Sequence, residues 1–274
     1  MTEAARVAIS EAGPASRRSP WPDLTGFLTL LRREIYRWVV LPNQTIVPPL
    51  LNALLYVVIF GYAIGGSIAE VEGAAYIVYI FPGLVMMNVV NGAYANTTTS
   101  LFIARHELFI QDLLVSPLSY LEMVLAYTLG GAIRGVLVGV LTLLVGYAFL
   151  GVHLHHAGAT LFFMSVSALA CAAFGNIVGL YSERWDHVAI YLNYVITPLV
   201  FLGGVFYSLK MLPAAWRMAN LANPIYYAVA GFRYGILGIA DVSPWICAAV
   251  GAALFASMFA VSVLLFKRGY KLRA

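Results

Sequence analysis

The three lysines of the chain are its candidates for a nucleotide-hydrolysing loop. Such a P-loop has the pattern Gly-x-x-x-x-Gly-Lys-Ser/Thr, in which the lysine contacts the phosphates and the hydroxyl coordinates magnesium. Lys210, Lys267 and Lys271 are followed by methionine, arginine and leucine, so none of them fits this pattern. We therefore expect no cofactor on this chain. If ATP drives the protein, hydrolysis takes place on a separate polypeptide.

The acidic and histidine side chains do not gather into a catalytic or metal-binding set. All twelve acidic residues lie in tails, loops or the ends of apolar segments, so a proton- or sodium-coupled relay has no obvious members. His153, His155 and His156 share one short loop, and clustered histidines can bind zinc. Neither cysteine nor carboxylate accompanies them. We predict no metal site and no catalytic residue, and the loop is a compositional hint only.

The composition is typical of a protein with several membrane spans. Of 274 residues, 62% are hydrophobic and 10% are charged, and the mean hydropathy is +0.86. A soluble domain of this length would carry more charge. The net charge of +4 does not indicate nucleic-acid binding, because the basic residues cluster beside the expected membrane boundaries. Cys171 and Cys247 lie in apolar segments, where we expect packing rather than a disulfide.

The apolar pattern predicts an all-α membrane protein with six transmembrane helices. We expect residues 1–22 to form a disordered cytoplasmic tail and residues 23–274 to form one transmembrane domain. Basic residues precede the first span and follow the last, which places both termini in the cytoplasm. The expected spans are about 46–66, 76–102, 120–150, 159–181, 188–207 and 244–266.

Residues 23–40 predict an amphipathic helix that lies in the membrane surface. Arg32, Arg33 and Arg37 gather on one side of this helix. The apolar residues of the other side follow helical spacing and are Leu24, Phe27, Leu28, Leu31, Ile35 and Trp38.

Two further helices are predicted between the fifth and sixth spans, over residues 212–222 and 224–237. Neither is long enough to cross a bilayer, which takes about 20 residues. Asn223 before Pro224 is a good N-cap for the second helix. We expect a pair of short re-entrant helices on the outer side of the membrane.

The cytoplasmic loop between the second and third spans predicts a short amphipathic helix. Its apolar face would comprise Phe109, Ile110, Leu113 and Leu114, and its polar residues would be Glu107, Gln111 and Asp112. Pro117 ends this helix, and Ser119 with Glu122 forms a capping box that starts the third span. Such a helix suits docking into a groove of another protein. A surface connector without a partner fits the spacing equally well.

Two stretches carry a resemblance to a known family. They are LLVSPLSYLE, which begins at Leu113, and GGVFYSLKMLP…LANPIYYAVAGFRYGILG, which begins at Gly203. The chain resembles the ABC-2 type permeases, the transmembrane subunits of bacterial type-2 ABC exporters, and most of all their small inner-membrane branch. The resemblance implies a homodimer among membrane lipids of the inner membrane, docked to two copies of a cytoplasmic P-loop ATPase that holds the ATP and magnesium.

The resemblance also implies roles for particular segments. The loop helix would be the coupling helix that contacts the ATPase, and spans one, two and five would line or close a central path. The short helices after span five would cap that path on the outer side. The coupling residues would be Arg105, Glu107, Phe109, Gln111, Asp112 and Leu113.

Polar residues recur along one face of the second span, among them Asn88, Asn91 and Thr98. They could line a path for a polar substrate, or they could join helices by hydrogen bonds. A second set is aromatic, lies in and after the fifth span, and comprises Tyr194, Phe201, Phe206 and Tyr207. These residues would form a gate or would anchor the span at the membrane interface. The Gly203-Gly204 pair among them would let two backbones approach closely.

Arg134 is a charged residue within the third span. Such a charge is costly unless it meets carbonyls, water, lipid phosphate or an anionic substrate. A contact with an anionic group is therefore one hypothesis for Arg134. The alternative, which we favour, is that its side chain extends to the inner interface.

The expected function is that of the permease subunit of an ATP-driven exporter. An aromatic and apolar lining of the path would suit an amphipathic, lipid-like, drug-like or lipid-linked saccharide substrate, although the same composition also serves helix packing. The direction of transport follows from the resemblance alone. The competing hypothesis is a channel or carrier that works without ATP.

Overall fold

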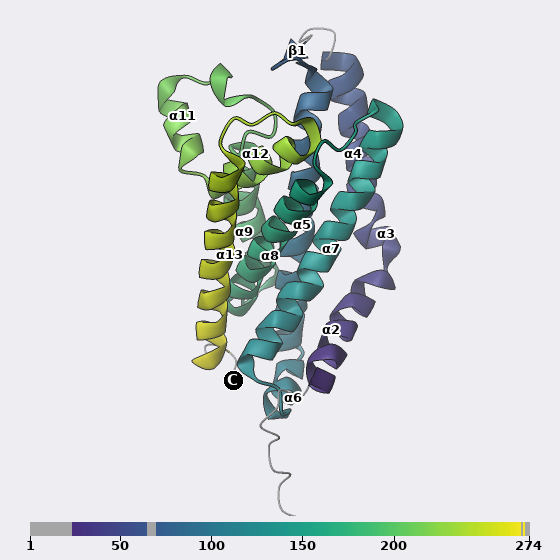
Figure 1. Ribbon diagram of the computed structural model, residues 1–274. Coiled ribbons are helices and arrows are strands. Elements are labelled where there is room, and N and C mark those ends of the chain that lie inside the picture. The colour runs from purple at the N-terminus through teal and green to yellow at the C-terminus, as the bar shows by residue number, and fades with distance from the viewer. Residues whose placement is uncertain (1–23, 65–69, 270, 272–274) are drawn as a thin grey trace, which may run out of the picture.

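Helices make up nearly all of the regular structure in the computed structural model, which describes residues 24–64, 70–269 and 271 (Figure 1). The expected tail, 1–22, lies outside these residues. The long or amphipathic helices are α2 (Leu24–Val39), α4 (Val47–Val58), α5 (Tyr76–His106), α6 (Phe109–Val115), α7 (Tyr120–Leu150), α8 (Ala157–Tyr181), α12 (Pro224–Leu237) and α13 (Pro244–Lys267). The prediction of a mainly helical membrane protein is confirmed, and one hairpin of strands β1 (Glu70–Val71) and β2 (Ala74–Ala75) is an addition to it.

Five helical segments of the described residues are long and apolar enough to cross a membrane, where we predicted six. They are Pro42–Gly61, Tyr76–His106, Tyr120–Leu150, Ala157–Tyr181 and Pro244–Lys267. Among them α5 is the most enclosed, with 72% of its most apolar window buried, against 11% for α13. α5 packs against both α7 and α8 (Figure 1), so it forms the centre of the bundle.

The predicted fifth span, 188–207, takes a broken form. It consists of α9 (Trp185–Tyr191), a π-helical turn η2 (Leu192–Ile196) and α10 (Thr197–Phe201). Pro198 lacks a backbone N–H, and the Thr197 hydroxyl donates to the Leu192 carbonyl at 2.9 Å, which accounts for the widened turn. The helical part has 17 residues, or about 25 Å, less than the roughly 30 Å hydrocarbon core. The six-span count is therefore not confirmed.

The first span is also interrupted. A single turn, α3 (Pro42–Thr45), precedes α4, and a π-helical segment η1 (Ile59–Ile64) follows it. Pro48 and Pro49 occupy the first turn of α4, where the missing N–H groups have no intrahelical partner to lose. The segment runs in the same direction as α2 and continues it (Figure 1).

The two short helices before α13 have nearly the predicted bounds. α11 covers Ala214–Leu221, after a 3-10 turn η3 at Leu209–Met211, and α12 begins at Pro224. The Asn223 side chain accepts from the Ile225 N–H at 3.0 Å, as the predicted N-cap requires. Both helices lie with β1 at the end of the molecule opposite α6 (Figure 1). Their depth in a membrane stays a prediction.

The amphipathic helix α2 has nearly the expected bounds and packs a mixed face against the bundle, and its place in the membrane surface stays a prediction. Leu30, Glu34 and Trp38 are its buried residues, whereas Leu24 and Leu28 are exposed. α2 packs along α7 (Figure 1), and Gly130 of α7 lies against the Glu34 side chain. Leu30, Glu34 and Trp38, which are spaced by four residues, therefore face the bundle, and they include a carboxylate as well as apolar side chains.

Candidate functional site

The loop between α5 and α7 forms the predicted amphipathic helix at one end of the bundle. α6 begins after Leu108, whose φ of 60° breaks the chain direction at the end of α5. Ile110 and Leu113 are buried. Glu107, Gln111 and Asp112 are exposed, so the helix presents a polar, acidic face outward. The capping box of Ser119 and Glu122 that starts α7 is confirmed by both of its hydrogen bonds.

The apolar face of α6 packs into a cluster contributed by several helices. Its buried members are Leu30, Leu101, Ile110, Leu113, Met123, Val124, Ala126, Tyr127, Leu180 and Phe266. In addition, the Arg33 guanidinium of α2 lies 3.7 Å from the centre of the Phe109 ring. A displacement of α6 would therefore act on α2, α5, α7, α8 and α13.

Arg105 belongs to the last turn of α5 rather than to α6. Its Nη1 donates to the carbonyls of Gly179, Leu180 and Ser182 at 3.2, 2.6 and 3.1 Å. Its Nε donates to the Lys271 carbonyl at 2.9 Å. The carbonyls that end a helix lack intrahelical partners, so Arg105 caps α8 and attaches the segment after α13. Its assignment as a coupling residue stays a prediction.

An aromatic cluster joins η1, α5, α10 and the turn after α10 at the end of the bundle opposite α6 (Figure 1), which is the predicted outer end. The Phe60 ring is 5.5 Å from that of Phe206 and 6.3 Å from that of Tyr76, and Phe201 is 5.2 Å from Phe206. The Tyr76 hydroxyl donates to the Phe206 carbonyl at 3.1 Å. The structure thus brings together Phe201 and Phe206 of the predicted gate and adds Phe60 and Tyr76 to them.

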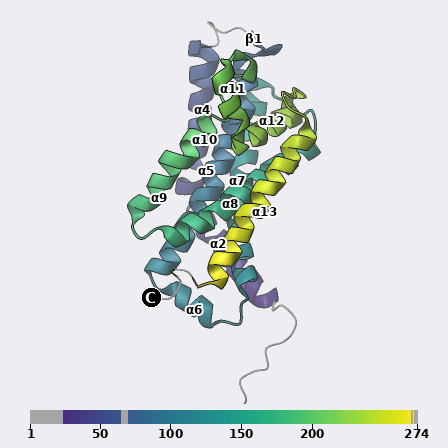
Figure 2. The ribbon, with the colours of Figure 1, turned by 90° about the vertical axis from the view of Figure 1, so that its left-hand side faces the viewer.

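The other two aromatic candidates lie apart from this cluster. The Tyr207 hydroxyl accepts from the Asn220 amide at 2.8 Å, which joins the turn after α10 to α11. Tyr194 is 78% exposed on η2. α4, α9 and α10 lie along one edge of the molecule and α13 along the other (Figure 2). Tyr194 therefore presents its ring on the surface of the α9–α10 segment.

The turn that follows α10 and contains Gly203 and Gly204 is held by buried ionic contacts that the sequence patterns did not identify. Arg233 of α12 is 1% exposed and pairs with Asp241 at 3.3 Å. It also donates to the Gly204 carbonyl at 2.6 Å and lies over the Tyr79 ring of α5. Gly204 has a φ of 72°, and the Gly203-Gly204 pair packs within this chain, against α12. The sequence signal that could have revealed this pair is an arginine between apolar and aromatic residues with an acidic residue eight positions later.

The hairpin makes a second ionic contact with the same turn. Lys210 pairs with Glu72 at 2.6 Å, and the Ser208 hydroxyl donates to Glu72 at 3.1 Å. The hydrogen bond from Lys210 holds the pKa of Glu72 below its ordinary value. The outer end of α5 is therefore connected to the chain that follows α10 by both aromatic and ionic contacts.

The polar residues of α5 mostly join helices within the chain. Asn88 is 8% exposed, and its amide donates to the Pro49 carbonyl at 3.4 Å and to the Thr142 hydroxyl at 3.3 Å. Thr98 is fully buried. Asn91 is half-buried, and its Oδ1 has no hydrogen-bond partner among the described residues. The alternative of interhelical hydrogen bonds thus has geometric support at Asn88, and a pathway role stays a prediction for all three.

Arg134 lies in a polar group formed by α2, α5 and α7. Its Nη1 donates to Asn96 Oδ1 at 3.4 Å, and the Arg37 Nη2 donates to the same oxygen at 2.9 Å. Glu34 is 1% exposed; it accepts from the Ser100 hydroxyl at 2.5 Å and lies 3.8 Å from Arg37. Burial raises the pKa of Glu34 above its ordinary value. The spacing of Leu30, Glu34 and Trp38 by four residues could have revealed this buried carboxylate.

The histidine loop lies between α7 and α8, at the outer end. The rings of His155 and His156 are 4.4 Å apart, and that of His156 is 5.3 Å from Tyr234. Within the described ranges, no three histidine, cysteine, aspartate or glutamate residues group in a way that could hold a metal ion. The loop makes ring contacts with α12, and we assign it no chemistry.

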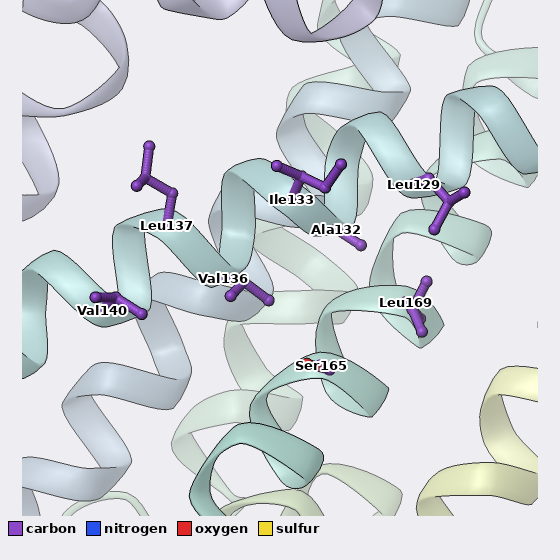
Figure 3. A pocket seen from close by; sticks show the side chains of 8 residues that line it. All are labelled: Leu129, Ala132, Ile133, Val136, Leu137, Val140, Ser165 and Leu169. Carbon is purple, nitrogen blue, oxygen red and sulfur yellow. The ribbon is translucent and has the colours of Figure 1, made fainter. Parts of the chain in front are cut away.

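Apolar and mixed cavities open on the surfaces of the described helices. One, of about 420 Å³, is an apolar groove between α7 and α8 (Figure 3) lined by Leu129, Ala132, Ile133, Val136, Leu137, Val140, Ser165 and Leu169. Another, of about 200 Å³, is lined by α8, α12, α13 and the broken span. The third, of about 230 Å³ and mostly polar, lies beside Arg105 and Glu183. None of the three contains the predicted gate residues, and the first two have the character of lipid-facing grooves.

Comparison with known proteins gives a consistent result. The sequence pattern of the ABC-2 type transporter family matches residues 25–237. The chain is 36% identical over 242 residues to the inner membrane transport permease YadH of Escherichia coli K12, covering 88% of this chain and 94% of that protein. It is 24% identical over 226 residues to nodulation protein J of Rhizobium leguminosarum bv. viciae, covering 77% and 82%. Nodulation protein J of Rhizobium meliloti is likewise 24% identical, over 223 residues.

The family match covers the amphipathic helix, the loop helix α6, the broken span and the two short outer helices. Together with the apolar helices, it identifies a multi-pass protein of the inner membrane and a transmembrane subunit of a transporter. This chain belongs to the ABC-2 type transporter family.

Proposed function

We propose that this chain is the permease subunit of an ATP-driven exporter, and that two copies of it work with two copies of a separate cytoplasmic ATPase. ATP-driven closure of the ATPase pair would press on α6 of each permease. The cytoplasmic end of the bundle would move with α6, and the contacts at the outer end would separate. Both termini would lie on the cytoplasmic side, together with α6.

The structure of α6 is the observation that carries this proposal. Its apolar side is fixed to the bundle through Ile110 and Leu113, while Glu107, Gln111 and Asp112 remain exposed. A docking helix needs this division, because one face must bind the partner and the other must transmit the force. Leu108 is 55% exposed and Val115 88% exposed, so apolar side chains also border the polar face.

The outer aromatic cluster supports an amphipathic or lipid-like substrate. Phe60, Tyr76, Phe201 and Phe206 close the outer side between the first, second and fifth spans of one copy. Aromatic and apolar groups offer little to a strongly polar solute but accommodate an acyl chain or a flat drug. We propose that the substrate passes this cluster on its way to the outer leaflet.

Charge reversal on α6 tests the coupling assignment. In vesicles that contain the permease and its ATPase, the Glu107→Lys and Asp112→Lys double variant should abolish transport-coupled ATP hydrolysis, because the ATPase would meet charges of the wrong sign. We expect at least a tenfold fall in the permease-dependent part of phosphate release, since like charges that face each other across an interface cost a few kcal/mol.

Glu70→Lys is the matched control, because this exposed carboxylate lies on β1, at the end opposite α6. The control variant should keep the coupled activity. Normal coupled hydrolysis in the α6 double variant would remove the coupling assignment.

A further inference from the structure

Two arginine side chains from different helices converge on one oxygen atom. The Arg37 Nη2 of α2 donates to Asn96 Oδ1 at 2.9 Å and also to the Asn96 carbonyl at 2.9 Å. The Arg134 Nη1 of α7 approaches the same Oδ1 at 3.4 Å. Two guanidinium groups repel each other unless an anion lies between them. The neutral amide oxygen of Asn96 supplies only part of the negative charge that this geometry suits.

Around Asn96, hydrogen-bond donors outnumber acceptors and positive charges outnumber negative ones. Arg37 Nε, Arg134 Nε and Asn96 Nδ2 are buried donors without a hydrogen-bond partner among the described residues. Among the described residues, no carboxylate forms an ion pair with Arg134. Glu34 lies 3.8 Å from Arg37, but it also accepts a hydrogen bond from the Ser100 hydroxyl. The group therefore has surplus donors and positive charge. Burial also raises the pKa of Glu34, which weakens its neutralising effect.

The surroundings indicate that an anion would reach the group from the lipid. Exposed apolar side chains lie next to it in sequence on both helices, among them Tyr36 (67%), Val40 (52%) and Ile133 (39%). Arg37 itself is 31% exposed, so the group is open on one side. α7 has 31 residues, or about 46 Å, which exceeds the roughly 30 Å hydrocarbon core. Arg134 lies about 21 Å along this helix, near its middle. Arg37, which donates to the same Asn96 oxygen, lies just before Pro42, where the first candidate span begins, so the group comes within reach of the headgroup layer through the long arginine side chains.

We propose that Arg37 and Arg134, together with the side-chain amide of Asn96, bind the phosphate of an anionic phospholipid from the inner leaflet. The phosphate oxygens accept from the two guanidinium groups, and the acyl chains lie along the exposed apolar surfaces of α4 and α7. Bidentate contacts of this kind are the usual mode of phosphate recognition by arginine. Because the site joins α2, α5 and α7, a bound lipid stabilises the contact of the amphipathic helix with the bundle.

Lipid binding to the full-length protein in detergent tests this site. Native mass spectrometry would compare phosphatidylglycerol with phosphatidylcholine, which carries the same phosphate but no net charge. The wild type should bind phosphatidylglycerol about tenfold more tightly, and Arg134→Gln and Arg37→Gln should each lose most of that preference. Arg134→Lys keeps the charge and should retain part of it, which separates loss of the site from misfolding.

Arg32→Gln is the control for general attraction to anionic lipid, because Arg32 is exposed on the same helix. Equal binding of phosphatidylglycerol by Arg134→Gln, Arg32→Gln and the wild type would overturn the proposal. Inorganic phosphate should not displace the lipid at millimolar concentration. If it displaced phosphatidylglycerol completely, the site would recognise a free anion, and the assignment to lipid would be wrong.

Discussion

Arg105 shows how a residue of the predicted docking loop serves the fold itself. The sequence places it among the charged residues of the cytoplasmic loop, where the family resemblance implies contact with an ATPase. In the structure its guanidinium meets four backbone carbonyls, three of them at the end of α8. A guanidinium so engaged has few donors left for a partner protein.

Arg105→Gln should lower the free energy of unfolding by about 2 kcal/mol, because the α8 carbonyls lose a charged donor. In detergent, the thermal unfolding midpoint should fall by roughly 4–8 °C. Arg184→Gln, a change of the same kind at an exposed position, should leave it nearly unchanged. An unaltered midpoint in Arg105→Gln combined with lost ATPase binding would show that Arg105 is a docking residue instead.

Single residues were also the hardest feature to predict. The capping box at Ser119 and the N-cap at Asn223 follow from local sequence, because their partners lie within three residues. Glu34, by contrast, is buried through contacts with α5 and α7 that are far away in the sequence. The pairing of Arg233 with Asp241 required knowledge of the fold around α12, since the sequence places Arg233 in the predicted helix 224–237 and Asp241 in the connection after it.

At the scale of elements, α5 and the turn after α10 approach each other closely at the end of the bundle that carries the aromatic cluster. Gly83 of α5 lies against the backbone of Val205: a Cβ atom at Gly83 would lie 2.7 Å from the Val205 Cα and 2.8 Å from its carbonyl oxygen. Pro82 precedes it inside the helix. Only glycine permits this contact, because backbone atoms cannot move aside as a flexible side chain can.

Gly83→Ala should therefore displace the turn that carries Phe206. We expect a destabilisation of about 1–3 kcal/mol, measured by thermal unfolding, and faster thiol labelling of a cysteine at Tyr207 from the outer side. Gly158→Ala provides the comparison, since a Cβ atom at Gly158 of α8 meets no other atom within 4 Å. That variant should be neutral or slightly more stable. Equal labelling rates in the two variants would show that the approach at Gly83 does not hold the turn.

The long helices could be predicted well, and the broken span could not. The capping box and a left-handed Gly151 define both ends of α7, whose bounds agree with the predicted 120–150. The span expected at 188–207 is not confirmed as a continuous α-helix, because hydropathy does not register a π-helical turn or the loss of helix after Phe201. The sequence pattern also does not report the β1–β2 hairpin, whose strands have two residues each.

At the scale of the whole molecule, the proposed dimer requires a surface for the second copy. The edge formed by α4, α9 and α10 (Figure 2) exposes large apolar side chains, among them Leu51, Leu55 and Tyr194. This edge also borders the outer aromatic cluster at Phe60 and Phe201. Pairing of two such edges would place the clusters of both copies around one central path.

Oxidative cross-linking checks this arrangement. In a background with Cys171 and Cys247 replaced by serine, Tyr194→Cys should give a covalent dimer in membranes. Ala256→Cys, an exposed position midway along α13, should remain monomeric. Cross-linking through Ala256→Cys but not through Tyr194→Cys would assign the contact between copies to the other edge.

The central claim is that the chain moves its substrate only when a separate ATPase drives it. The most direct test is phosphate release and solute accumulation by the purified chain in vesicles, with and without that ATPase. The chain alone should hydrolyse no ATP above empty vesicles and should concentrate no solute, and both activities should appear when the ATPase is added. Sustained ATP-dependent accumulation of solute by this polypeptide alone would contradict the claim.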